Sequence, residues 1–197
     1  MIYVQEEINA SKNRYNNQSF SMKKLLAIIS LSALLVSCKK EITELPPETQ
    51  TGANTFGAKV DGNFFGPQGF GPLPANDILE ARWIGNDFLI IARNFASSPN
   101  EREMEIFVRE AKLGGTFQLN TNVTYPTRSA SYAYFVKRSI TPEFEWITSA
   151  THTGTVTLTR VDTVQRIVSG RFAFTGEEIF DAAGALNVTE GRFDVKY

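Results

Sequence analysis

The fold of this chain is decided by the stretch TVTLTRV, residues 155–161, followed by IVSGRFAFT, residues 167–175. In the first run threonine alternates with Val156 and Leu158, and in the second run every other position holds an apolar residue or a glycine. Because successive side chains of a β-strand point to opposite faces, this period of two predicts two strands that each bury one face. Strands at this spacing, with turn residues between them, are typical of an antiparallel β-sheet.

The last strand of the domain needs a change of register. The apolar residues of 186–188 share one parity, whereas those of 193–197 share the other. A strand that keeps one face buried must therefore slip by one residue, and a β-bulge at Glu190-Gly191 would do this. We expect Gly191 to supply the positive φ of the bulge, because glycine has no Cβ to clash there.

Other segments show the same short alternation between turn residues. The run 55–60 is followed by Asp61-Gly62, a pair that favours a tight hairpin turn. Residues 88–92 form a continuous apolar run, which suits a central strand covered on both faces. In residues 103–109 apolar side chains alternate with charged ones, which predicts a half-buried strand with a solvated face. We therefore predict an all-β fold, either an antiparallel β-sandwich or a partly open barrel.

The N-terminal part of the chain has the order of regions found in a signal peptide. Lys23 and Lys24 precede an apolar run that ends in Leu35-Val36-Ser37-Cys38. The run is shorter than the roughly 20 apolar residues that a membrane span needs. The ending resembles a bacterial lipobox, in which the signal is cut off and the cysteine thiol is lipidated. The resemblance implies that Cys38 is the lipidation site, with palmitate as the expected acyl group, and that membrane lipid is a partner of the protein.

The sequence divides into four parts. Residues 1–21 are polar and form an upstream extension that is either untranslated or disordered, and residues 22–37 are the lipoprotein signal peptide. Residues 38–54 are rich in Pro, Thr and charge, which predicts a flexible tether. Residues 55–197 are expected to form a single β domain, long enough to bury a core.

Four stretches of the β domain form a recurrent pattern: residues 55–62, residues 155–162, residues 167–175 and residues 188–195. Together they resemble a family of uncharacterised Bacteroidota lipoproteins that is known only as a domain of unknown function. The resemblance implies a β-rich, membrane-tethered domain and brings no known activity or functional residues. We expect the protein in the cell envelope, lipid-anchored to the outer membrane, on either its periplasmic or its surface face.

Charge and cysteine content exclude several classes of function. The whole chain has 20 basic and 21 acidic residues, of which four basic and two acidic residues lie in residues 1–37. The mature part, from Cys38 on, therefore carries 16 basic and 19 acidic residues. Such a nearly neutral balance argues against a nucleic-acid partner, since those proteins carry a basic patch. Cys38 is the only cysteine, so the chain can form neither a disulfide framework nor a thiolate metal cluster.

His152 is the only histidine, so any Ser-His-Asp or Cys-His catalysis would have to use it. It stands between threonines at the entrance of a predicted strand, which favours a turn residue. A histidine-based metal site would need further ligands that the sequence lacks. We therefore expect no catalytic residues, no metal site and no cofactor.

Carboxylates supply the alternative hypothesis. Glu143 and Glu145 form one group, and Glu177, Glu178 and Asp181 form another. A glycosidase needs two carboxyl groups across a cleft. The two positions of the first group would share one face of a strand, which favours solvated charge over catalysis.

Aromatic side chains are the remaining candidates for contact with a ligand. Most aromatic residues of a β-sandwich pack its core. Phe70 and Tyr125 are expected in loops, where binding residues concentrate, and Trp146 is a further candidate for an exposed platform. The sequence thus predicts a membrane-anchored, non-catalytic binding or structural module whose partner is an envelope protein or a glycan. The alternative is a hydrolase or carbohydrate-active enzyme that uses a carboxylate pair.

Overall fold

A computed structural model describes residues 42–69, 77–97, 99–139, 143–180 and 183–197. This part of the chain is all-β, as predicted, and its helical content is the short 3-10 helix η1 (Ala111–Leu113). The strands are β1 (Thr55–Val60), β2 (Asn63–Phe65), β3 (Leu79–Ile84), β4 (Asp87–Asn94), β5 (Glu101–Val108), β6 (Gly115–Leu119), β7 (Tyr132–Arg138), β8 (Phe144–Ile147), β9 (Gly154–Asp162), β10 (Ile167–Glu178) and β11 (Leu186–Lys196).

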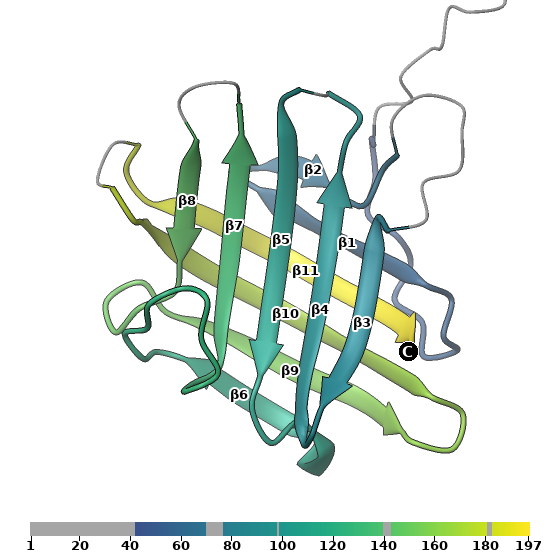
Figure 1. Cartoon of the computed structure of the whole chain (residues 1–197). Coiled ribbons are helices and arrows are strands. Elements are labelled where there is room, and N and C mark those ends of the chain that lie inside the picture. The colour runs from purple at the N-terminus through teal and green to yellow at the C-terminus, as the bar shows by residue number, and fades with distance from the viewer. Residues whose placement is uncertain (1–41, 70–76, 98, 140–142, 181–182) are drawn as a thin grey trace, which may run out of the picture. The chain divides into compact units, whose positions relative to one another are not determined.

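The strands form two antiparallel layers that share the long strand β10. The first layer, sheet A, has the order β2-β1-β11-β10-β9-β6, and the second, sheet B, has the order β8-β7-β5-β4-β3. The beginning of β10 pairs with β9 and β11, whereas Glu177 and Glu178 at its end pair with β8. Figure 1 shows the strands of sheet B crossing those of sheet A at a steep angle. The architecture is thus a curled antiparallel sheet that forms a half-barrel.

The hydrophobic core lies between the two layers. Sheet A supplies alternate residues of 155–161 and 167–175. Sheet B supplies alternate residues of its three central strands, β7, β5 and β4. Burying each large apolar side chain contributes roughly 1.5–3 kcal/mol. The main core residues are Val156, Leu158, Val168, Phe172 and Phe174 from sheet A, with Phe88, Ile90, Met104, Ile106 and Phe135 from sheet B.

Sheet B is buried on both faces. On β4, Phe88 and Ile90 face the core, whereas Leu89 and Ile91 belong to a second apolar cluster on the outer side. This confirms the prediction of a central strand covered on both faces. The prediction for β5 was wrong in one respect: its charged face is not solvated, because Glu103 and Glu105 are only 8% and 7% exposed.

The register change in β11 is confirmed, but its conformation differs from the prediction. The pairing of β1 with β11 shifts between Gly57 and Lys59, opposite residues 189–192 of β11. Glu190, not Gly191, has the positive φ, at 54°. Gly191 is required for a different reason, because a Cβ atom there would collide with the ring of Phe172.

Residues 42–54, which we call the strap, were expected to belong to a flexible tether, yet they contact the domain. The peptide N–H groups of Thr51, Gly52 and Ala53 donate to the carboxylate of Asp194 on β11, at 2.8–3.1 Å. Asn54 accepts a hydrogen bond from the backbone of Lys196 at 2.9 Å. The described part of the predicted tether therefore lies on the outer face of sheet A.

Candidate functional site

The outer face of sheet B gathers tyrosines, carboxylates and apolar side chains. They come from alternate positions of neighbouring strands, so the period of two places them on one face. The segment of residues 120–131, which links β6 to β7, supplies Val123 and Tyr125 to the same cluster. The strand residues of this face are Leu89, Glu105, Phe107, Tyr132, Tyr134 and Ile147.

Three tyrosines pack against one another on this face. The ring of Tyr125 stacks on that of Tyr134, with centroids 3.9 Å apart and planes 1° from parallel. The same ring meets Tyr132 edge-on, at 6.1 Å and 82°. These ring contacts fix Tyr125 against the sheet, although it comes from a loop.

The tyrosine hydroxyls donate to carboxylates of sheet B. Tyr132 donates to Glu105, and Tyr125 makes a longer hydrogen bond of 3.4 Å to the same carboxylate. Tyr134 donates to Glu145 at 2.7 Å. A second group of charges lies beside them, in which Glu103 pairs with Arg93 at 2.7 Å and with Arg138 at 3.6 Å.

Burial raises the pKa of the Glu105 carboxyl above its usual range, and the nearby charge of Glu103 adds to this effect. Hydrogen bonds from Tyr132 and Tyr125 favour the ionised form, yet they do not cancel the cost of burial. Burial and the charge of Glu105 raise the pKa of Tyr125 to about 12. The phenol therefore remains a hydrogen-bond donor at neutral pH.

A pocket of about 430 Å³ opens beside this cluster. We call it the tyrosine pocket. Strands β3, β4 and β5 of sheet B supply its floor, β7 adds Tyr132, and residues 125–128 of the covering segment supply one wall. Its lining residues are Arg82, Ile84, Leu89, Glu105, Phe107, Tyr125, Pro126, Thr127, Arg128 and Tyr132.

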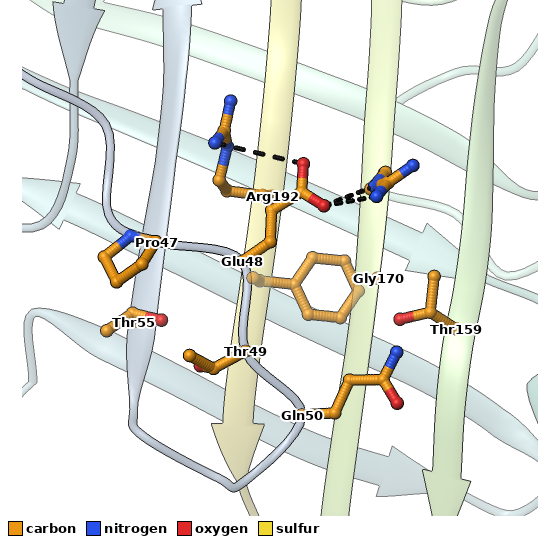
Figure 2. Close-up of a pocket in the computed structure, with 10 residues that line it drawn as sticks. Pro47, Glu48, Thr49, Gln50, Thr55, Thr159, Gly170 and Arg192 are labelled. Atoms are coloured by element: carbon orange, nitrogen blue, oxygen red, sulfur yellow. Dashed lines mark hydrogen bonds and ion pairs between the residues drawn. The ribbon is translucent and has the colours of Figure 1, made fainter.

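A second recess, of about 210 Å³, lies between the strap and the outer face of sheet A. Figure 2 shows Glu48 of the strap beside Arg192, and Glu48 also forms an ion pair with Arg171. The Nε of Arg171 donates to Glu48 at 2.7 Å, and Arg192 lies 3.9 Å from the same carboxylate. Glu48 therefore pairs with both arginines, and the recess is best explained as packing space beneath the strap.

Asp194 anchors the strap at the other end of this recess. The residue is 1% exposed, and it accepts hydrogen bonds from Ser169, from the hydroxyl of Thr49 and from three peptide N–H groups of the strap. Burial acts to raise the pKa of Asp194, but the hydrogen bonds outweigh it and hold the pKa well below its usual range. Asp194 is therefore an ionised carboxylate with a structural role.

A larger hollow of about 670 Å³ lies at the beginning of the strap, beside Phe56 and Phe65. Its lining reaches Ile42 and Gln68, close to residues 41 and 70–76, which lie outside the described part of the chain. Since its walls are not all described, the tyrosine pocket is the better-defined candidate site.

The structure separates the aromatic candidates chosen from the sequence. Tyr125 lines the tyrosine pocket. Trp146 forms no exposed platform: it is 7% exposed, packs against the rings of Phe135 and Phe144, and donates to a backbone carbonyl at 2.8 Å. The parity of β8 turns Trp146 toward the core. Phe70 lies outside the described residues, as does the expected lipidation site Cys38.

The predicted polar candidates lie apart from the pocket lining. His152 stands in a turn, where its Nδ1 is 3.5 Å from Glu177, and Glu143 pairs with Arg138 at 3.3 Å. Asp181 lies outside the described residues. Within the described ranges, no group of three or more His, Cys, Asp or Glu residues is arranged to hold a metal ion.

Glu105 is the functional candidate that the sequence analysis missed. Its place in an alternating strand indicated a solvated carboxylate. The signal that could have identified it is the pair Tyr132 and Tyr134 on β7. These tyrosines are spaced two residues apart, as Glu103 and Glu105 are on β5. A carboxylate and a phenol on the same face of adjacent strands form a natural hydrogen-bonded pair.

No family model, no curated protein and no solved structure matches this chain. In the described part of the chain, no helix has the length and apolar character needed to cross a membrane.

Proposed function

We propose that the protein is a lipid-anchored, non-catalytic binding module of the cell envelope, and that the tyrosine pocket is its binding site. The observation that carries this proposal is the pocket itself, an opening of about 430 Å³ on the outer face of sheet B. Small-molecule sites have volumes of roughly 300–1,000 Å³, largely apolar walls and a few convergent polar groups. The tyrosine pocket has an apolar floor and places two arginines, a carboxyl and two phenols around it.

The state of the polar groups favours binding over catalysis. A carboxylate-pair hydrolase needs two carboxyl groups facing one cleft. Glu105 is the one carboxyl among the described residues that line the tyrosine pocket. The neighbouring carboxylates Glu103 and Glu145 are paired with arginines and with Tyr134. Such a site can hold a ligand without a second group to activate water.

The strap supports the proposal that the domain is held close to a membrane. If Cys38 carries the lipid, three residues separate it from Ile42, the first described residue of the strap, which makes four Cα-to-Cα steps. At about 3.3–3.6 Å per extended residue, these span at most about 14 Å. Since the strap is bound to sheet A, a lipid on Cys38 would hold the domain close to the membrane surface.

The anchoring part of the proposal is tested by Cys38→Ala in cells labelled with a palmitate analogue. We expect the variant to lose the label and to leave the membrane fraction. Ser37→Ala is the matched control, because it keeps a small residue before the cysteine and should remain labelled. A Cys38→Ala protein that stays labelled would contradict lipidation at this residue.

The pocket is tested by calorimetric titration of the purified full-length protein in detergent with a panel of monosaccharides, disaccharides and small organic acids. We expect at least one compound to bind, and Tyr125→Ala to weaken that binding. Phe180→Ala, which removes an exposed ring outside the pocket, is the control. Hydrolysis of nitrophenyl glycosides that Glu105→Gln abolishes would support the enzyme hypothesis instead.

A further inference from the structure

We infer that the tyrosine pocket takes a small ligand that carries a carboxylate on an apolar ring, with the carboxylate at Arg128 and the ring on the floor of the pocket. This inference rests on the proposed binding function and adds the chemical class of the ligand.

The tyrosine pocket has an unbalanced cation in its lining, Arg128. Arg128 lies on an exposed part of the covering segment, and no described residue forms an ion pair with its guanidinium. Arg82, from β3, lines the pocket as well, but it forms an ion pair with Glu80. A guanidinium binds a carboxylate with two parallel hydrogen bonds, which gives both strength and orientation.

The carboxyl of the pocket, Glu105, does not neutralise this cation. Glu105 is 7% exposed, and both of its oxygens accept hydrogen bonds from tyrosines. The charged and titratable groups that act on it are Glu103 of the same strand, Arg82 of β3, Tyr125 of the covering segment and Tyr132 of β7. The charge that Arg128 presents to solvent is therefore available to a ligand.

An apolar floor lies in the same pocket as these arginines. Ile84, Leu89 and Phe107 come from three adjacent strands, β3, β4 and β5, and line one continuous pocket. Phe107 is 1% exposed, and its ring stacks on that of Tyr132 from the neighbouring strand, with centroids 5.5 Å apart. A flat ring can cover this floor while its acidic group reaches the mouth. The volume of about 430 Å³ limits the ligand to a small molecule.

Two sources share this chemistry: an aromatic acid and an acidic sugar whose ring has an apolar face. The test uses matched pairs of probes, phenylacetate against phenylacetamide and glucuronate against glucose. Each is titrated by calorimetry into the full-length protein in detergent at low salt. We expect the acid of at least one pair to bind and its neutral partner to bind about tenfold more weakly or not at all.

The arginine is tested in the same experiment. Arg128→Gln should weaken binding of the acid about tenfold and leave the melting temperature unchanged, because the side chain is exposed. Arg166→Gln is the control, since it removes an exposed arginine from the turn between β9 and β10. Binding of the acid should also weaken as salt rises.

Two results would overturn the inference. Equal binding of acid and neutral probes, sensitive to Tyr125→Ala, would show a pocket that does not select a carboxylate, and the binding function would stand. Failure of every acid in a protein that binds a neutral member of the broader panel would also overturn the inference and leave the binding function standing. Failure of the whole panel would instead overturn the proposed function.

Discussion

The two outer faces of this domain each bury a carboxylate, with opposite consequences. Asp194 on sheet A is 1% exposed and Glu105 on sheet B is 7% exposed, so both are removed from water. Yet the pKa of Asp194 is held well below its usual range, whereas burial raises the pKa of Glu105. Burial alone therefore does not decide the charge state of an acid in this fold.

The difference lies in the donors that reach each carboxylate. Asp194 accepts from three peptide N–H groups and from the hydroxyls of Thr49 and Ser169. Glu105 accepts from two phenols, one of them at 3.4 Å, and has Glu103 nearby. Several donors to the charged form outweigh desolvation, whereas two do not. Asp194 thus binds the strap to sheet A, whereas Glu105 is a carboxyl with a raised pKa that lines the tyrosine pocket.

Removing the carboxylate of Asp194 should have the largest effect. Asp194→Ala leaves buried N–H groups unsatisfied and should lower the free energy of unfolding by about 3–5 kcal/mol. Limited proteolysis should then cut within residues 45–54, since the strap loses its anchor. Denaturant unfolding measures the first effect, with Glu177→Gln as a control for an exposed acid. Full protection of the strap in Asp194→Ala would show that Glu48 and the apolar contacts hold it alone.

The same carboxylate predicts a loss of stability in acid. Because the folded state depresses the pKa of Asp194, its contribution is complete above the unfolded value of about 3.9 and is lost as pH falls through the folded value. The denaturation midpoint of the parent protein should therefore decrease below about pH 4. Asp194→Asn should flatten this part of the profile. Parallel profiles for the two proteins would argue against the depressed pKa.

The bulge that turns Asp194 outward should be the next most sensitive feature. Gly191→Val places side-chain atoms where the ring of Phe172 lies, and we expect a loss of about 2–3 kcal/mol. Glu190→Gly should be neutral or stabilising, because Glu190 holds the positive φ. Thermal unfolding of both variants distinguishes the two roles. If Glu190→Gly were the more damaging change, the positive φ would not be the costly feature.

The smallest effect should come from Glu105. A raised folded pKa means that its contribution is complete below the unfolded value of about 4.3 and is lost as pH rises through the folded value. Glu105→Gln removes this loss, so the variant should be more stable than the parent at pH 7 and equal to it near pH 4. Denaturant unfolding at the two pH values measures the difference. A variant that is destabilised at pH 7 would show that the ionised form is preferred.

Much of the architecture could be predicted from local patterns. The alternation of 155–161 and 167–175 fixed which side chains of β9 and β10 enter the core, and the parity change in β11 required a bulge. Asp61 and Gly62 both have positive φ, 47° and 81°, as their hairpin turn demands. These features were predictable because they depend on the period of the strand and on steric limits of single residues.

The candidate site could be predicted only in part, through Tyr125. A period of two tells which side chains share a face, but it does not tell what covers that face. Glu105 became a buried acid because residues 120–131, with the ring of Tyr125, pack over sheet B. Trp146 became a core residue because β8 joined the same layer as β7.

What the sequence by itself determined, then, is the strand pattern, the turns and the need for a bulge in β11, because neighbouring residues set each of these. Only the tertiary structure decided that the strap is bound, that Glu190 rather than Gly191 takes the strained conformation, and that two buried acids have opposite pKa shifts. Asp194 meets Thr49 across 145 positions of the chain, and Glu105 meets Tyr132 across 27. Donors brought together over such separations are set by packing, and no local pattern encodes them.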